Sequence, residues 1–241
     1  MVTHTGPELS GAALADWELW HARRLALVTS ATGSLALIQT RWQSGDQAIT
    51  LEDALAGQPT TVIVTKEKRT DFDGNVIAQG IRLWDSNSQG IQSFETIQTY
   101  PFDPAWVFDG VFIPYSESRA VPFEYVREVP GLRNLSVPGE IRVRIVDTEY
   151  SLDAFDDEGT LILAFADSTN ETETYPAGRF LVLPKDANSN RVVLDFNRAY
   201  VPPCGFSIAY NCPLPPPQNR LKVSVLAGEK KPTFHNNYEI H

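Results

Sequence analysis

The residues best able to do chemistry lie in one stretch, DFNRAYVPPCGFSIAYNCPLPPPQNRL, which spans 195–221. Arg198 and Arg220 carry guanidinium groups, which can hold a carboxylate or a phosphate through two parallel hydrogen bonds, as lysine cannot. Further side chains that can hydrogen-bond a ligand are Asp195, Asn197, Tyr200 and Asn219. Long ordered loops on a rigid scaffold often carry binding sites. The stretch therefore indicates a ligand-binding or catalytic loop.

The same stretch can instead be a structural connection, because it is rich in proline. The prolines are Pro202, Pro203, Pro213, Pro215, Pro216 and Pro217. Proline fixes φ and has no N–H to donate to a sheet, so the segment should be extended and irregular. Under this interpretation its polar side chains satisfy the backbone, and its aromatic side chains anchor it to the core.

The stretch also contains the thiol pair Cys204 and Cys212, the only two cysteines of the chain. A disulfide can form if their Cα atoms lie within about 7 Å, although a reducing compartment would keep both as thiols. Zinc would need two further ligands, and no second cysteine pair or neighbouring histidine supplies them. A nucleophilic Cys204 would lack a nearby histidine base. We therefore expect no metal and no cofactor.

Four residues outside the stretch are candidates to converge on it. They are Arg82 and Asp85, from RLWD, and Tyr175 and Arg179, from TYPAGR. Together with Asp195, Tyr175 and Arg179 could alternatively serve a metal-independent hydrolase or isomerase. No phosphate-binding glycine motif and no G-x-S-x-G nucleophile elbow occurs in the sequence.

Two kinds of element must position these residues. Residues 8–28 predict a helix, because Leu14, Trp17, Leu19, Trp20 and Leu25 follow an imperfect helical spacing. Short apolar or alternating runs after Gly33 predict strands. These runs are 34–42, 60–66, 81–85, 111–115, 141–147, 160–167, 179–184, 191–196 and 222–228.

Turn signals such as FDGN at 72–75 and DDEG at 156–159 separate the strands at the spacing of antiparallel meanders. The prediction is therefore a mainly β fold, an antiparallel β-sandwich or distorted barrel with an N-terminal helix. We divide the chain into an N-terminal helical segment, 1–30, and a single β-rich domain, 31–241, with a sub-sheet seam suggested near 116–138.

The composition of the chain argues against two classes of partner, nucleic acids and membranes. The chain has 241 residues and 42% hydrophobic residues, enough to bury a sizeable core. Its formal net charge of -10 argues against a nucleic-acid partner, because phosphate backbones are held mainly by Lys and Arg. No stretch approaches the about 20 apolar residues of a membrane span, and none resembles a signal peptide. We expect a soluble, cytoplasmic protein with no membrane partner.

Three ordered segments together resemble the bacterial and archaeal family of domain of unknown function 1684 (DUF1684). They are LILAFADSTNETETYPAGRFLVLP with VVLDFNRAYVPPCGFSIAYNCPLPPPQNRLKVSVLAGEK, RLWD with YPFDPAWVF, and WELWHARRLALVTSATGSLAL. The likeness runs from about Trp17 to Lys230, and the block around the two cysteines is its most specific part. The family name assigns no activity, and members include exported, lipid-anchored and cytoplasmic proteins.

The chain departs from the family pattern at two places. Val201 stands where an Asn commonly precedes the Pro-Pro-Cys, and Asn170 and Glu171 follow Thr169 where a Thr-x-Gly is common. Any shared activity that used these positions would be altered here. The preferred hypothesis is a small-ligand binding protein, with an anionic metabolite as the candidate ligand of the 195–221 loop. The alternatives are the metal-independent enzyme and a protein-interaction scaffold; the oligomeric state is left open.

Overall fold

The computed structural model describes residues 7–43, 49–71, 74–127, 132–157, 159–184 and 189–240. The helices are α1 (Pro7–Val28), α2 (Leu51–Leu55) and α3 (Gln89–Ser93). The strands are β1 (Leu37–Trp42), β2 (Val62–Thr70), β3 (Val76–Asp85), β4 (Phe94–Thr99), β5 (Val107–Glu124), β6 (Leu132–Ile145), β7 (Thr148–Asp153), β8 (Phe155–Asp157), β9 (Thr160–Phe165), β10 (Arg179–Leu183), β11 (Arg191–Asp195) and β12 (Glu229–Phe234). Short 3-10 helices are η1 (Pro104–Trp106), η2 (Phe196–Arg198), η3 (Pro203–Gly205), η4 (Pro217–Asn219) and η5 (His235–Asn237).

The centre of the molecule is a core between two antiparallel sheets. One sheet has the order β11-β5-β6-β7 and the other the order β10-β9-β8. Alternate side chains of their strands point inward, as the period of two in a strand requires, and bury residues such as Ile141, Leu163 and Leu194. The predicted fold class, mainly antiparallel β with an N-terminal helix, is confirmed. No sheet of the described residues closes into a barrel.

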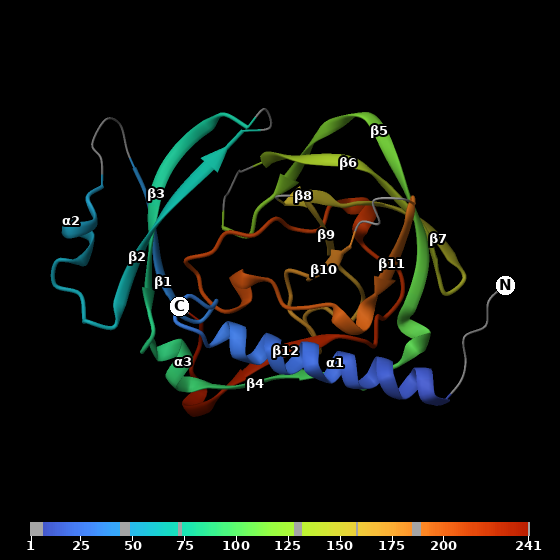
Figure 1. Cartoon of the computed structure of the whole chain (residues 1–241), viewed down its shortest axis with the longest axis horizontal. Coiled ribbons are helices and arrows are strands. Elements are labelled where there is room, and N and C mark those ends of the chain that lie inside the picture. The colour runs from blue at the N-terminus through green and yellow to red at the C-terminus, as the bar shows by residue number, and fades with distance from the viewer. Residues whose placement is uncertain are drawn as a thin grey trace.

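Helix α1 confirms the helix predicted over 8–28 and lies across the body (Figure 1). Much of its attachment is polar. Trp17 Nε1 donates to the carbonyl of Asn197 at 2.8 Å, Arg24 Nη2 donates to the carbonyl of Val201 at 2.7 Å, and His21 Nε2 lies 3.0 Å from the carbonyl of Ile97. Between Gly11 and its end, the only fully buried residue of α1 is Val28.

A third antiparallel sheet, of order β1-β3-β2, stands at one side of the core, with α2 beyond it (Figure 1). The loop 204–212 joins this sheet to the body: Ser207 Oγ donates to the carbonyl of Leu37 at 2.6 Å, and Thr40 Oγ1 donates to the carbonyl of Ala209 at 2.9 Å. The remaining strands, β4 and β12, form a two-stranded ribbon under α1 (Figure 1).

One predicted strand is wrong. Residues 222–228 form no strand, and the C-terminal strand is β12, which begins at Glu229. The carbonyls of Val225 and Ala227 are turned toward the guanidinium of Arg179 instead of a neighbouring strand. Gly228, with a φ of +78°, then redirects the chain into β12, and its carbonyl accepts a hydrogen bond from the Tyr100 N–H.

Other segments of the sequence map as follows. The stretch 195–221 begins at the last residue of β11, and after Asp195 it contains η2, η3 and η4 and no strand, as its prolines predict. The stretch 116–138 lies in the β5–β6 pair, whose register shifts between Pro114 and Arg119. Residues 128–131 of that stretch, and parts of both turn signals, are outside the described residues. Among the helices described, none has both the length and the hydrophobicity to span a bilayer.

Candidate functional site

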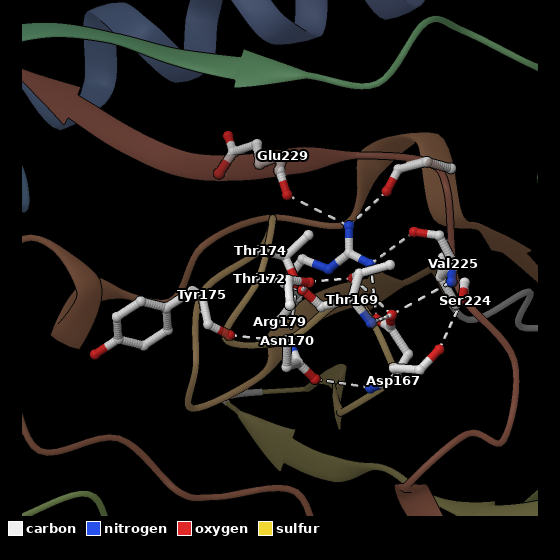
Figure 2. A network of polar contacts seen from close by, with 12 residues as sticks. Asp167, Thr169, Asn170, Thr172, Thr174, Tyr175, Arg179, Ser224, Val225 and Glu229 are labelled. Atoms are coloured by element: carbon white, nitrogen blue, oxygen red, sulfur yellow. Dashed lines mark hydrogen bonds and ion pairs between the residues drawn. The ribbon is translucent and has the colours of Figure 1, made fainter.

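Arg179 lies in the interior rather than at a ligand surface (Figure 2). Its Nη2 donates to Asp167 Oδ2 at 2.8 Å and to the carbonyl of Val225 at 3.0 Å, and its Nη1 donates to the carbonyls of Ala227 at 2.5 Å and Glu229 at 3.3 Å. The guanidinium thus holds the segment 225–229 in place by taking the role of a neighbouring strand: it supplies hydrogen-bond donors to carbonyls, such as those of Val225 and Ala227, that have no sheet partner. We assign Arg179 a positioning role.

Asp167, the partner of Arg179, is fixed by the turn that follows β9. Its Oδ1 accepts hydrogen bonds from the Thr169 backbone N–H at 2.8 Å and from the Thr169 hydroxyl at 2.6 Å. Asn170 Oδ1 accepts from the Asp167 N–H at 2.7 Å, and Asn170 Nδ2 donates to the carbonyl of Tyr175 at 2.9 Å (Figure 2). The departure from the family pattern at 170–171 therefore falls in a polar turn that is also bonded to the C-terminal segment, where Lys231 donates to the carbonyl of Glu171.

A second buried ion pair joins α1 to β12. Arg24 Nε lies 3.0 Å from Glu229 Oε1, and Glu229 Oε2 accepts the Val201 N–H at 2.7 Å. Burial raises the pKa of the Glu229 carboxyl, and the charge of Arg24 partly offsets this. The Arg24 guanidinium also stacks over the ring of Tyr200, 4.9 Å from its centroid.

These contacts form the inner wall of a groove of about 660 Å³ between α1, β10 and β11. We call it the α1 groove. Its lining residues are Trp20, Arg24, Leu27, Ser34, Leu181, Val182, Pro184, Val193, Asp195, Arg198, Tyr200 and Pro203. A pocket of this size that is mainly apolar, with a few polar groups, is the usual form of a small-molecule site.

The apolar part of the α1 groove is open to solvent. Leu27 is 60% exposed, Val182 43% and Val193 37%. Trp20, Arg24 and Leu27 share one face of α1, because residues four and seven positions apart lie above one another on a helix. The two strands opposite therefore meet a helix face that combines aromatic, cationic and aliphatic side chains.

Three of the predicted site residues line the α1 groove: Asp195, Arg198 and Tyr200. Asp195 caps η2, with Oδ1 accepting the Asn197 N–H at 3.1 Å and Oδ2 accepting from Arg198 Nε at 3.2 Å. Arg198 Nη2 also pairs with Asp16 of α1. Burial raises the pKa of Tyr200 to about 12, so its hydroxyl keeps its proton at neutral pH.

The two predicted asparagines act within the fold. Asn197 Oδ1 accepts the Asp103 N–H at 2.9 Å, and its Nδ2 donates to the Asp103 carbonyl at 2.9 Å. Asn219 Oδ1 accepts the Asp153 N–H at 2.9 Å, while its Nδ2 donates to the carbonyls of Asp153 at 2.7 Å and Ala164 at 2.8 Å. Each amide thus joins two separate segments of backbone.

The other predicted residues lie outside the α1 groove. Arg82 pairs with Glu67 at 2.9 Å on the β1-β3-β2 sheet. Asp85 Oδ1 accepts the Asn87 N–H at 2.9 Å in the turn after β3. Arg220 is exposed, and its side chain forms no hydrogen bond or ion pair with any residue that the structure describes.

Tyr175 lies with the thiol pair. Its hydroxyl donates to the carbonyl of Cys204 at 3.0 Å, in a cluster that contains both cysteines. Tyr175, Arg179 and Asp195, the candidates for the enzyme hypothesis, therefore do not line one cavity in the described part of the chain. Within the described residues, no group of three or more His, Cys, Asp or Glu side chains is arranged to hold a metal.

Sequence reasoning missed Arg24, Leu27, Val182 and Val193. The signal available for the helix was an arginine four positions after Trp20, on the same face. For the strands, nothing distinguished Val182 and Val193 from ordinary strand residues, because their role depends on the position of α1 across β10 and β11.

Comparisons with known proteins give a family and a weak structural neighbour. The family model described as "Protein of unknown function (DUF1684)" matches residues 92–230. An uncharacterized protein of Haloarcula marismortui, determined by solution NMR, is 28% identical, with a match that covers 57% of this chain and 77% of that chain at a TM-score of 0.47. None of the curated proteins compared with the chain matches it.

Proposed function

The chain belongs to the family of unknown function DUF1684, and we propose that it binds a small amphipathic molecule in the α1 groove. One observation supports this proposal: a single groove of about 660 Å³ is lined by both exposed apolar and polar side chains. The apolar ones are Leu27, Val182 and Val193, and the polar ones are Arg24, Arg198 and Tyr200. Exposed apolar side chains gathered in a concave surface are a common mark of a binding site.

The apolar side chains of the α1 groove determine the length and the apolar character of the ligand that it can bind. Trp20 and Leu27 lie about 10 Å apart along the helix axis, since a helix rises 1.5 Å per residue. A ligand that lies along α1 would cover Leu27, Val182 and Val193, which are partly exposed without it. An aromatic ring or a short alkyl chain has the matching length, and Trp20 offers it an aromatic surface.

The polar side chains of the α1 groove determine which polar head group of a ligand it can accept. The hydroxyl of Tyr200 forms no hydrogen bond with any described residue, so it is free to bind a ligand oxygen. Arg24 is already paired with Glu229, and Arg198 with Asp16 and Asp195. Because three carboxylates face two guanidinium groups, the cationic charge is fully offset, and the groove favours a neutral polar head, or at most a single carboxylate, over a multiply charged phosphate.

The proposal is tested with 4-phenylbutyrate as the probe, by isothermal titration calorimetry on the wild type and on Val182→Glu. We expect measurable binding to the wild type and about tenfold or greater weakening in the variant. The new carboxylate would lie beside the ligand and interrupt the apolar wall, and about 1.4 kcal/mol is enough for a tenfold change.

The matched control is Val111→Glu, which places the same charge on an exposed strand residue outside the α1 groove. Its affinity should equal that of the wild type. Equal weakening in both variants, or no binding of 4-phenylbutyrate and of its neutral analogue 4-phenylbutanol to the wild type, would refute the proposal.

A further inference from the structure

Cys204 and Cys212 are in direct contact, although seven residues lie between them in the sequence. The N–H of Cys204 donates to Cys212 Sγ at 3.3 Å, and both are free thiols buried in the same cluster. Cys204 belongs to η3, and Cys212 is held in place through its carbonyl, which accepts the Val126 N–H at 3.1 Å. Cys212 Sγ therefore lies against the Cys204 backbone, and the two thiol groups are close enough to hydrogen-bond each other.

Their surroundings distinguish the two thiols. Arg127 lies against the same loop, where its Nε donates to the carbonyl of Tyr210 at 3.1 Å. Hydrogen bonding with Cys212, together with Tyr175 and the charge of Arg127, lowers the pKa of Cys204. The same pairing, with burial, raises the pKa of Cys212. Cys204 is therefore the more readily deprotonated of the two thiols.

We propose that Cys204 and Cys212 form a redox-active dithiol that a small hydroperoxide converts into a disulfide. The Cys204 thiolate attacks one peroxide oxygen, and the O–O bond breaks, which leaves a sulfenic acid and, after protonation, one molecule of water or alcohol. Cys212, losing its proton, then attacks the Cys204 sulfur and displaces hydroxide, which takes up that proton as water. Two thiols are oxidised to one disulfide, and the peroxide is reduced.

The position of the pair gives this reaction a structural consequence. The loop between the cysteines carries Ser207 and Tyr210. The hydroxyl of Ser207 binds the carbonyl of Leu37 in β1, and the ring of Tyr210 packs edge-on against Trp84 of β3, with 6.4 Å between ring centroids. The loop therefore helps to attach the β1-β3-β2 sheet to the body, and a disulfide across the base of the loop would stiffen this attachment.

The test treats the whole chain with hydrogen peroxide and measures its mass under denaturing, non-reducing conditions. We expect the loss of two hydrogen atoms, a cross-link between the peptides that contain Cys204 and Cys212, and full reversal by dithiothreitol. The midpoint of thermal unfolding should rise by about 5 °C on oxidation, since closing a short loop restricts the unfolded chain. If both cysteines remain open to alkylation after denaturation of the treated protein, the proposal is wrong.

Two variants separate the roles of the thiols. In Cys212→Ser, hydrogen peroxide in the presence of dimedone should label Cys204, because the sulfenic acid has no partner thiol. In the matched variant Cys204→Ser, Cys212 should be labelled at least about tenfold more slowly, as expected for a thiol with little thiolate. Equal labelling, or faster labelling of Cys212, would overturn the assignment of Cys204 as the attacking group. None of these readouts depends on ligand binding in the α1 groove.

Discussion

Replacing Arg179 by methionine is expected to lower the free energy of unfolding by about 3–5 kcal/mol, the usual cost of breaking a buried ion pair by removing one partner. Asp167 would remain buried without its counter-charge. The carbonyls of Val225 and Ala227 would also lose their donor, in a segment with no strand to replace it. Urea unfolding followed by circular dichroism measures the change.

Arg144→Met is the control for this experiment, because it removes the same charge from an exposed pair with Glu149. Surface pairs contribute about 0–1 kcal/mol, so this variant should unfold close to the wild type. Arg179→Lys should recover only part of the loss, since an ammonium group cannot reproduce the planar fork that reaches Asp167 and three carbonyls. Equal stability of the two methionine variants would contradict a clamping role for Arg179.

Asn219→Ala is expected to cost about 3 kcal/mol, the second largest effect. The side chain satisfies three buried or half-buried backbone groups: the N–H and carbonyl of Asp153 and the carbonyl of Ala164. Alanine would leave these groups without partners, and each unsatisfied group costs about 1–3 kcal/mol. The measurement is again the urea midpoint, with the slope of the transition as a check on the two-state assumption.

The neighbouring variant Gln218→Ala provides the comparison. Gln218 is exposed and hydrogen-bonds the Asp153 carboxylate rather than the backbone. Its removal should cost less than about 1 kcal/mol, because water can replace an exposed hydrogen bond. A loss as large as that of Asn219→Ala would mean that the backbone contacts of Asn219 are not what holds η4 to β7 and β9.

Most helices and strands of this fold could be predicted from the sequence, because the spacing of apolar residues that indicates them is a local property of the chain. The helix over 7–28 and strands such as β10 and β11 follow from apolar spacing and turn residues. The error at 222–228 shows the limit of that signal. A run of alternating apolar residues forms a strand only if a neighbouring strand can hydrogen-bond with it. Here Arg179, which is distant in the sequence, donates hydrogen bonds to the carbonyls of Val225 and Ala227 instead.

The residues of the candidate site were harder to predict from the sequence, because the site depends on which side chains the fold buries. Arg179 begins β10 and Arg198 follows β11, yet Arg179 is enclosed by Asp167 and three carbonyls, whereas Arg198 lines the α1 groove. Spacing along the chain could not distinguish them. Asp195 and Tyr200 were identified because they lie in the unusual proline-rich stretch, whereas Arg24 comes from a helix whose position only the fold defines.

The most direct test of the account is an NMR titration of the ¹⁵N-labelled protein with 4-phenylbutyrate, read at the tryptophan indole N–H signals. Trp20 lines the α1 groove, whereas Trp84 lies in the β1-β3-β2 sheet and Trp106 packs against Phe196 in the core. We predict a saturable shift of the Trp20 signal with little change at Trp84 and Trp106. Saturable shifts confined to Trp84 or Trp106, or no shift at any indole, would contradict ligand binding in the α1 groove.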